Sequence, residues 1–412
     1  MQKFTILLVS LFVLICPAFA TKSDFNNFNS SDYGLDTTDA VELISNEQKN
    51  SDINFDNDIS SATTEKPDEK TLKEKFQDIY HLEVTRIDKP TFLMQDILTK
   101  RFGKDSALES IQVGGGYVAD WSMLFSENGS ITNDYEYNAI SPFVEGIFKD
   151  NNADFKLMIR FSPKSSMNWM QYLVSDAYIA TNKIPHHRVQ VGNFRPPVGY
   201  EGERSPYLLD FISRSQLAST LGTTRKFGAR VKGNFSLVDY DLGGYSSDTF
   251  WQEFFPGTEF IGWMNIKPLG LTNGKYGNLV LGGGVQTGHR NNDYTVASTH
   301  VGYEYKKFNF DFEYANANGY NGFQMRSTDK HAGGYYISLG YRITPKIQCL
   351  VCYDEFDYDK STPGNKQKEC TVGLNYFIKG QGLRLMLNYA FCKGNASVRN
   401  SHRIMLGTQI LI

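Results

Sequence analysis

The chain has 412 residues, a formal net charge of −3 and an aromatic content of 14%. No apolar run reaches about 18 residues, so no segment predicts a membrane-spanning helix. Because basic residues are not in excess, no nucleic-acid partner is predicted.

The first twenty residues predict export. Lys3 supplies a positive charge, residues 6–16 form an apolar run, and residues 18–20 read Ala-Phe-Ala, a small-x-small cleavage site. Cys16 could suggest a lipoprotein, but a lipobox needs a small residue where Ile15 stands. We therefore expect a cleaved signal peptide over residues 1–20.

Two segments separate this signal from the strands. Residues 21–71 are rich in Asp, Asn, Ser, Thr and Lys, and such a segment cannot offset its ordering entropy, so it should be disordered. Residues 72–87 have apolar side chains at helix-like spacing, and residues 92–107 show a weaker version. We predict a short helical linker over residues 72–108, either a trimer-forming stub or a marginal helix.

From residue 109 to residue 412, apolar and polar residues alternate with the period of a β-strand. Leu157 and Ile159, for example, alternate with Lys156, Met158 and Arg160. Persistent alternation means strands with one apolar and one polar face. The same pattern recurs over residues 308–314, 335–343, 383–391 and 404–412.

Two architectures share this pattern, a soluble β-sandwich and an outer-membrane barrel. The barrel is favoured because aromatic residues cluster near strand ends, shorter and longer connections alternate, and Ile412 ends an amphipathic strand. Residues 267–275 are counted as a short turn and residues 290–293 as an outer loop. With seven turns and eight loops, the prediction is all-β: a 16-stranded antiparallel transmembrane β-barrel over residues 109–412.

The third outer loop of this count, residues 196–222, is the longest connection. Pro196 and Pro197 end the preceding strand, since proline cannot donate to a ladder. The loop carries both charge signs and an apolar stretch at residues 207–212, which suits a loop folded against a wall.

The residues around this loop resemble the phosphate-selective porin O and P family. Residues 191–201 read Val-Gly-Asn-Phe-Arg-Pro-Pro-Val-Gly-Tyr-Glu, similar to the family's V-G-x-F-K-P-P-F-G-x-E. Residues 176–178 (Asp-Ala-Tyr), 211–215 (Phe-Ile-Ser-Arg-Ser) and 225–228 (Arg-Lys-Phe-Gly) extend the likeness, which is strongest between residues 141 and 245. The resemblance implies a sixteen-stranded trimeric porin whose third outer loop folds into the lumen.

Two departures argue against strict phosphate selectivity. Ser213 stands where the family has Glu, and the fifth outer loop, residues 290–293, lacks a dense arginine run. A narrow constriction lined by one charge sign enriches the opposite ion, so the basic strand residues favour anions, whereas mutual pairing of charges would leave no strong preference. The candidate pore-lining residues are Lys156, Arg160, Arg188, Glu201, Glu203, Arg204, Asp210, Arg214, Lys226 and Arg230.

Other motifs predict no catalysis and no metal site. Cys349 and Cys352 would point to opposite faces of a strand, so they cannot chelate one ion together. A disulfide is permitted after export, but small wall residues are the expected role of the cysteines. Ser401 and His402 are neighbours and face opposite sides, which argues against a barrel-embedded lipase.

The sequence therefore predicts an outer-membrane porin for passive diffusion of small hydrophilic solutes and ions, with a preference for anions such as phosphate. The alternative is a structural or adhesive barrel. The expected partners are these solutes, the lipid bilayer with its lipopolysaccharide, and two further copies in a homotrimer. No enzyme activity and no cofactor are predicted.

Overall fold

The computed structural model describes residues 92–412, with gaps at 95–97, 136–137, 150–152, 162–172, 223, 249–252, 254, 323–326 and 395–399. Every described residue belongs to one compact unit. The predicted signal peptide, the predicted disordered segment and the predicted helix over residues 72–87 lie outside the described residues. None of the helices in the described ranges is long and apolar enough to cross a membrane.

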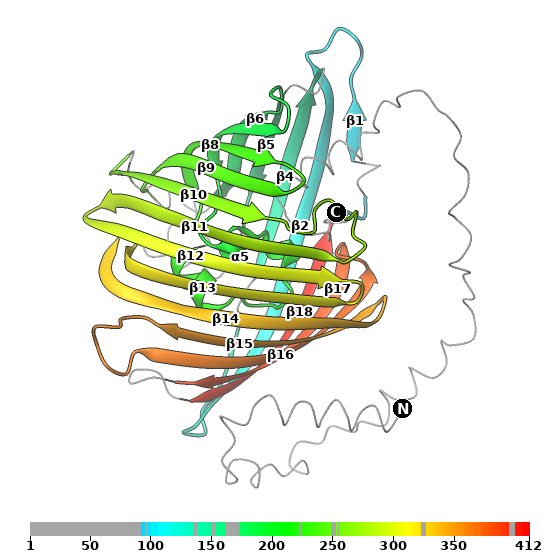
Figure 1. Ribbon diagram of the computed structural model, residues 1–412. Coiled ribbons are helices and arrows are strands. Elements are labelled where there is room, and N and C mark those ends of the chain that lie inside the picture. Colours follow the sequence, from blue (N-terminus) through cyan, green and yellow to red (C-terminus); the bar gives the residue numbers. More distant parts are fainter. Residues whose placement is uncertain are drawn as a thin grey trace, which may run out of the picture. The chain divides into compact units, whose positions relative to one another are not determined.

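Sixteen antiparallel strands form one closed ring, as the alternating pattern predicts (Figure 1). Their order round the ring follows the sequence, and the last strand closes it by pairing Ser401 to Leu411 with Ser126 to Gly116. Closure leaves no strand edge unpaired in a bilayer. The sixteen strands are β2 (Leu108–Ser126), β4 (Asn138–Phe148), β5 (Ala153–Ile159), β6 (Val174–Thr181), β7 (His187–Phe194), β8 (Lys226–Asn234), β9 (Val238–Ser246), β10 (Thr258–Ile266), β11 (Asn278–Arg290), β12 (Asn292–Tyr305), β13 (Phe308–Tyr320), β14 (Thr328–Thr344), β15 (Ile347–Asp357), β16 (Lys366–Lys379), β17 (Leu383–Lys393) and β18 (Ser401–Leu411).

Two short strands add to the edges of this ring. β3 (Ile131–Asp134) pairs with β2 beyond the residues that pair with β4, so β3 and β4 follow one another along β2. β1 (Thr99–Arg101) pairs with residues 110–112, where β2 projects past the end of β18. Part of the predicted helical linker 72–108 is therefore strand, because the projecting backbone of β2 offers hydrogen bonds there.

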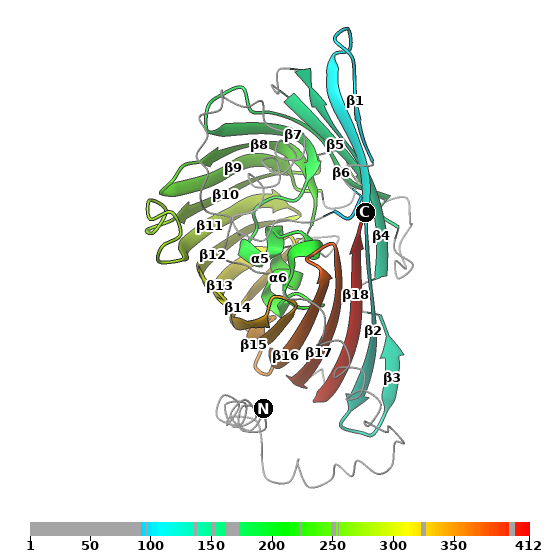
Figure 2. The ribbon, with the colours of Figure 1, turned by 90° about the vertical axis from the view of Figure 1, so that its right-hand side faces the viewer.

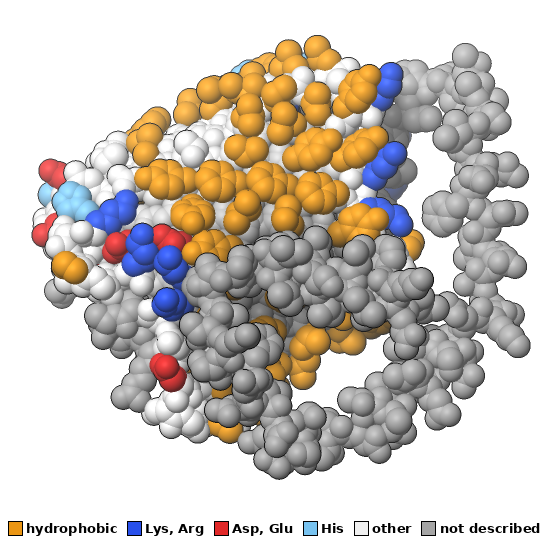
Figure 3. Space-filling model, turned by 60° about the horizontal axis from the view of Figure 1, so that its bottom comes forward, with side chains coloured by type: hydrophobic (Ala, Val, Ile, Leu, Met, Phe, Trp, Pro, Cys, Tyr) orange, Lys and Arg blue, Asp and Glu red, His pale blue; other side chains and the backbone are white. Residues whose placement is uncertain are grey.

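Side chains alternate between the outer surface and the lumen as predicted. On β5, Lys156 and Met158 are buried whereas Leu157 is 43% exposed, and on β17 Arg384 is buried whereas Leu385 is 47% exposed. Figure 3 shows the outward hydrophobic side chains gathered in a broad band over the strands. An apolar outer band around a polar lumen is the arrangement of an outer-membrane barrel, and it excludes the sandwich.

The connections alternate less strictly in length than expected. We call the end where β18 finishes the turn end and the opposite end, where the third loop starts, the loop end. The fifth connection at the loop end is Asn291 alone, at φ 65°, a left-handed conformation that asparagine tolerates. The turn-end connection between β10 and β11 spans residues 267–277 and is longer than the predicted 267–275.

The third loop, residues 195–225, contains three short helical elements. They are α5 (Tyr200–Glu203), the 3₁₀ helix η3 (Pro206–Leu208) and α6 (Gln216–Leu221). Figure 2 shows α5 and α6 inside the ring of strands. The predicted inward folding of this loop is confirmed by its contacts with the wall, described next.

Candidate functional site

The third loop turns inward at the prolines that follow β7. Gly199 precedes α5 at φ 73°, and a Cβ added there would collide with Glu313 of β13. The Glu313 carboxylate accepts hydrogen bonds from the Tyr200 N–H (2.8 Å) and the Glu201 N–H (3.1 Å). A glycine at this position therefore lets the first helical turn lie directly on a wall carboxylate, which supplies the acceptor that its free N–H groups need.

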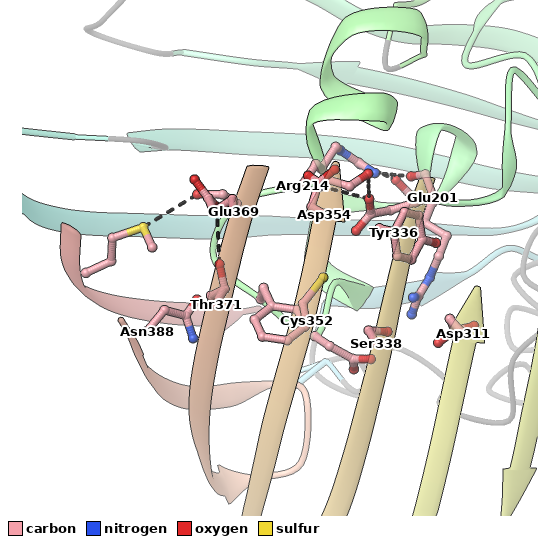
Figure 4. A pocket seen from close by; sticks show the side chains of 16 residues that line it. Glu201, Arg214, Asp311, Tyr336, Ser338, Cys352, Asp354, Glu369, Thr371 and Asn388 are labelled. Atoms are coloured by element: carbon pink, nitrogen blue, oxygen red, sulfur yellow. Dashed lines mark hydrogen bonds between the residues drawn. The ribbon is translucent and has the colours of Figure 1, made fainter. Parts of the chain in front are cut away.

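Inside the loop, Glu201 binds the start of α6. Its Oε2 accepts hydrogen bonds from the Ser215 N–H (2.9 Å) and the Ser215 hydroxyl (2.5 Å). The Ser215 Oγ in turn accepts from the Ala218 N–H at 3.1 Å, which makes Ser215 the N-cap of α6. The Arg214 guanidinium donates to the backbone oxygens of Glu201 and Arg204 (Figure 4). Glu201, Arg214 and Ser215 all stand in the family-like motifs, so these motifs stabilise the internal fold of the loop.

Helix α6 seats the loop on the wall of β12 to β15. Leu217 and Leu221 pack in an apolar cluster with Val296, Ala315 and Phe356. The Gln216 N–H donates to a carboxylate oxygen of Asp354 on β15. Apolar burial and a carboxyl acceptor at the helix start fix the same element.

The middle of the loop is held by polar side chains of the last three strands. Four wall residues, from β16 to β18, bind loop backbone atoms, so the loop runs along the wall from β12 to β18. These contacts are Asn375 Nδ2 to Asp210 O (2.9 Å), Arg384 Nη2 to Leu209 O (2.8 Å), Ile212 N to Asn388 Oδ1 (2.8 Å) and Gln409 Nε2 to Tyr207 O (3.1 Å).

A cavity lies between the loop and the strands β4 to β8, and we call it the basic cavity. It contains about 910 Å³ of space not filled by atoms, part of it open to solvent. Five cationic side chains line it against two carboxylates. The cations are Lys156, Arg160, Arg195, Arg225 and Arg230, and the carboxylates are Asp176 and Glu203.

A second cavity of about 560 Å³ lies between the loop and the wall of β13 to β18, and we call it the acidic cavity (Figure 4). Five carboxylates and two arginines line it, the reverse of the basic cavity. The carboxylates are Glu201, Asp210, Asp311, Asp354 and Glu369, and the arginines are Arg204 and Arg214. Ser213 also lines this cavity, so serine in place of the family's Glu removes one further negative charge there.

The ten predicted pore-lining residues are divided among three places. Lys156, Arg160, Glu203 and Arg230 line the basic cavity. Glu201, Arg204, Asp210 and Arg214 line the acidic cavity. Arg188 and Lys226 face inward as predicted but line neither of these cavities.

Arg188 and Lys226 are buried in ion pairs within the wall. The Arg188 guanidinium donates to both carboxylate oxygens of Asp154 at 2.6 and 2.7 Å, and its side chain is fully buried. Lys226 Nζ lies 2.8 Å from Glu259 Oε1, and both side chains are fully buried. These cations face carboxylates at close range and contribute little net charge to the open lumen.

Three charged residues of the basic cavity were missed by sequence reasoning. Arg195 and Arg225 flank the loop, just after β7 and just before β8, and both stand inside the family-like motif that could have identified them. Asp176 fits neither face of an alternating strand. A β-bulge in β6 explains it, because Ser175 and Asp176 both line the cavity and Asp176 Oδ1 accepts from Arg225 Nε at 2.6 Å.

The cysteines and the remaining polar motifs behave as wall residues. The four cysteines of the described ranges, Cys349, Cys352, Cys370 and Cys392, are free thiols. Ser401 is buried whereas His402 is exposed and contacts Tyr389, so the two face opposite sides. Within the described residues no group of three or more His, Cys, Asp or Glu side chains could hold a metal ion.

Comparison with known proteins gives one family and a set of similar structures. The phosphate-selective porin O and P family matches residues 273–409, downstream of the motifs at residues 176–228 that carry the resemblance. No curated protein matches the chain.

The similar structures are outer-membrane channels. OmpF of Salmonella typhi, in complex with daunomycin, is 11% identical (TM-score 0.56), with 74% of this chain and 98% of that chain covered. The channel DcaP of Acinetobacter baumannii is 10% identical (TM-score 0.52; 76% and 99% covered). The anion-selective porin of Comamonas acidovorans is 11% identical (TM-score 0.51; 73% and 100% covered). At such identities the likeness shows a shared fold.

The family match, the closed sixteen-stranded ring and the inward third loop agree with one another. Together they give the chain the fold of an outer-membrane porin, and its residues 273–409 are similar to the phosphate-selective porin O and P family.

Proposed function

We propose that this porin admits small hydrophilic solutes by passive diffusion and prefers anions, phosphate among them. The observation that supports this preference is the charge of the basic cavity, the larger of the two, where five cations oppose two carboxylates. A lumen wall of one sign inside a low-dielectric barrel concentrates ions of the other sign.

The strength of this preference depends on the cations that keep contact with solvent. Lys156 is buried beside Glu145 (2.6 Å), and Arg230 is buried beside Asp241 (3.1 Å), so both are largely neutralised. Arg225 is partly buried and pairs with Asp176 (2.6 Å), so it too is largely neutralised. Arg160 and Arg195 are partly buried, and these two arginines, the second at the root of the loop, are the proposed source of a moderate anion preference.

Planar-bilayer recording of the purified full-length protein tests this proposal. With a potassium chloride gradient across the bilayer, the sign of the zero-current potential should report chloride as the more permeant ion. Inorganic phosphate added to one side should lower the chloride current if it enters the same cavity. A cation-selective potential would overturn the anion preference, and the absence of channel steps would overturn the channel itself.

The proposal includes the setting of the channel. We place it in the outer membrane of a cell, exported by a signal peptide cleaved after Ala20, in contact with lipopolysaccharide, and assembled as a homotrimer. Two observations support this setting: the apolar outer band of the barrel and the family likeness. Chemical crosslinking in native membranes should give a trimer band, and a monomer alone would contradict that part.

A further inference from the structure

The basic cavity is lined by an apolar patch as well as by its charged residues. Phe92, Phe143, Met158 and Tyr207 line this cavity and pack together, with Leu411 behind them. We call the four lining residues the apolar collar. They come from three separate parts of the chain: the segment before the barrel, the strands β4 and β5, and the tip of the third loop.

Phe92 joins the two sides of this collar. Its ring meets the ring of Phe143 edge-on, with centroids 5.4 Å apart, and only 9% of the residue is exposed. The neighbouring Leu93 N–H donates to Leu411 O at 3.0 Å, which fixes the segment to the end of β18. A side chain from outside the barrel sequence is therefore held within the lumen near the turn end.

The loop side of the collar is also fixed. Gln409 binds the carbonyl of Tyr207 at 3.1 Å, and a Cβ added at Gly116 of β2 would collide with the Tyr207 ring. Because the ring lies directly on the β2 backbone, Tyr207 has little room to move. The gap between the loop tip and the β4–β5 wall is thus filled by Phe92.

We propose that Phe92 sets the size limit of the basic cavity, as an apolar restriction in series with the arginines. This inference rests on the proposed channel function and adds a residue that lies outside the barrel and outside the family-like motifs. An apolar ring at a narrow point restricts passage because a hydrated ion gains no polar contacts there to replace its water. Removing the Phe92 ring would admit about three more water molecules, at about 30 Å³ of liquid volume each.

The test compares Phe92→Ala with Leu93→Ala in the full-length protein. Leu93 is 41% exposed, does not line the cavity, and would keep its backbone hydrogen bond to Leu411 after the substitution. We expect Phe92→Ala to raise the single-channel conductance about twofold and to admit larger neutral polyethylene glycols. Leu93→Ala should leave both quantities at the wild-type values.

A third variant separates restriction from loss of structure. Phe92→Leu keeps an apolar side chain of smaller volume and should give intermediate conductance and an intermediate polymer size limit. Equal conductance and size limits for Phe92→Ala, Phe92→Leu and the wild type, in barrels that remain heat-modifiable, would overturn the role of Phe92. If the wild type itself forms no channels, the proposed function fails instead, so the two failures are distinguishable.

Discussion

Glu201 and Ser215, which lie 14 positions apart, meet through two hydrogen bonds to a single carboxylate oxygen. One residue belongs to α5 and the other caps α6, so the contact joins the two α-helices of the third loop. A carboxylate near a helix N-terminus is favoured by the free N–H groups there. The loop thus carries its own internal restraint in addition to its contacts with the wall.

Loss of this contact should make the third loop more mobile while the ring of strands stays closed. Ser215→Ala removes the cap of α6 and should lower the free energy of unfolding by about 1 kcal/mol. Limited trypsin digestion should then cut at Arg204 or Arg214 faster than in the wild type. Glu201→Ala should have a similar effect, and the double variant should cost less than the sum of the two because they share one contact. Strictly additive effects would show that the contact does not stabilise the loop.

The buried pair Arg188–Asp154 should affect stability and leave ion selectivity unchanged. Arg188→Met leaves a buried carboxylate without its guanidinium and should cost about 3–5 kcal/mol, measured by urea unfolding in detergent. Arg188→Met combined with Asp154→Leu removes both charges and should recover most of that loss. A changed zero-current potential in the double variant would show that Arg188 lines the pore.

Replacing Arg160 and Arg230 together by Glu should shift the zero-current potential towards cations in dilute salt. Both side chains line the basic cavity, and two unit charges about 6 Å apart at an effective dielectric near 20 interact by roughly 3 kcal/mol. The shift should shrink in about 1 M salt, where the screening length is about 3 Å. Lys346→Glu, at an exposed turn between β14 and β15, is the matched control for a change of charge far from the cavity. An unchanged potential in the double variant would place these arginines outside the ion path.

The direction of the barrel in the membrane can be tested with inserted epitopes. Asn365 lies in the connection between β15 and β16 at the loop end, and Lys306 lies in the turn between β12 and β13. Longer loops face outward in outer-membrane barrels, so antibody should reach an epitope at Asn365 on intact cells. Binding to an epitope at Lys306 should require permeabilisation. Labelling of Lys306 on intact cells would reverse the orientation.

The terminal strand should be indispensable for assembly. β18 pairs with β17 on one side and β2 on the other, so deletion of residues 401–412 leaves two open edges. We expect no heat-modifiable, protease-resistant barrel from such a chain. Deletion of residues 23–65, which precede every described strand, should still allow the barrel to fold. A stable barrel without residues 401–412 would contradict closure by β18.

The barrel could be predicted from the sequence because the face of a strand residue depends only on its position in the alternation. Leu157 and Lys156 point to opposite sides whatever lies beside them. The bulge at Asp176 breaks that rule, and no residue near it signals the break. The pairing of β1 with β2 could not be predicted either, since the three residues Thr99–Arg101 are too few to show the alternation of a strand.

The candidate site was less predictable because it depends on which strands and loop residues meet. Asp154 and Arg188 lie on strands two places apart, and their contact follows from the register of β5, β6 and β7. Glu203 meets Lys232 only after the loop has turned inward. Phe92 stands in a segment whose spacing resembles a weak helix, so its place in the lumen could not be predicted from the local sequence.

The polar contacts of the third loop with β17 and β18 also have a consequence for the order of folding. Leu209, Ile212 and Tyr207 bind partners that follow them by 175, 176 and 202 positions. Contacts this distant in sequence form late, because a long loop must close before they stabilise anything. During assembly of the barrel, the middle of the loop therefore lacks these partners until the last hairpin has joined the ring. Completion of that hairpin closes the ring and positions the loop in the same event, so an unfinished chain has neither a sealed wall nor a defined channel.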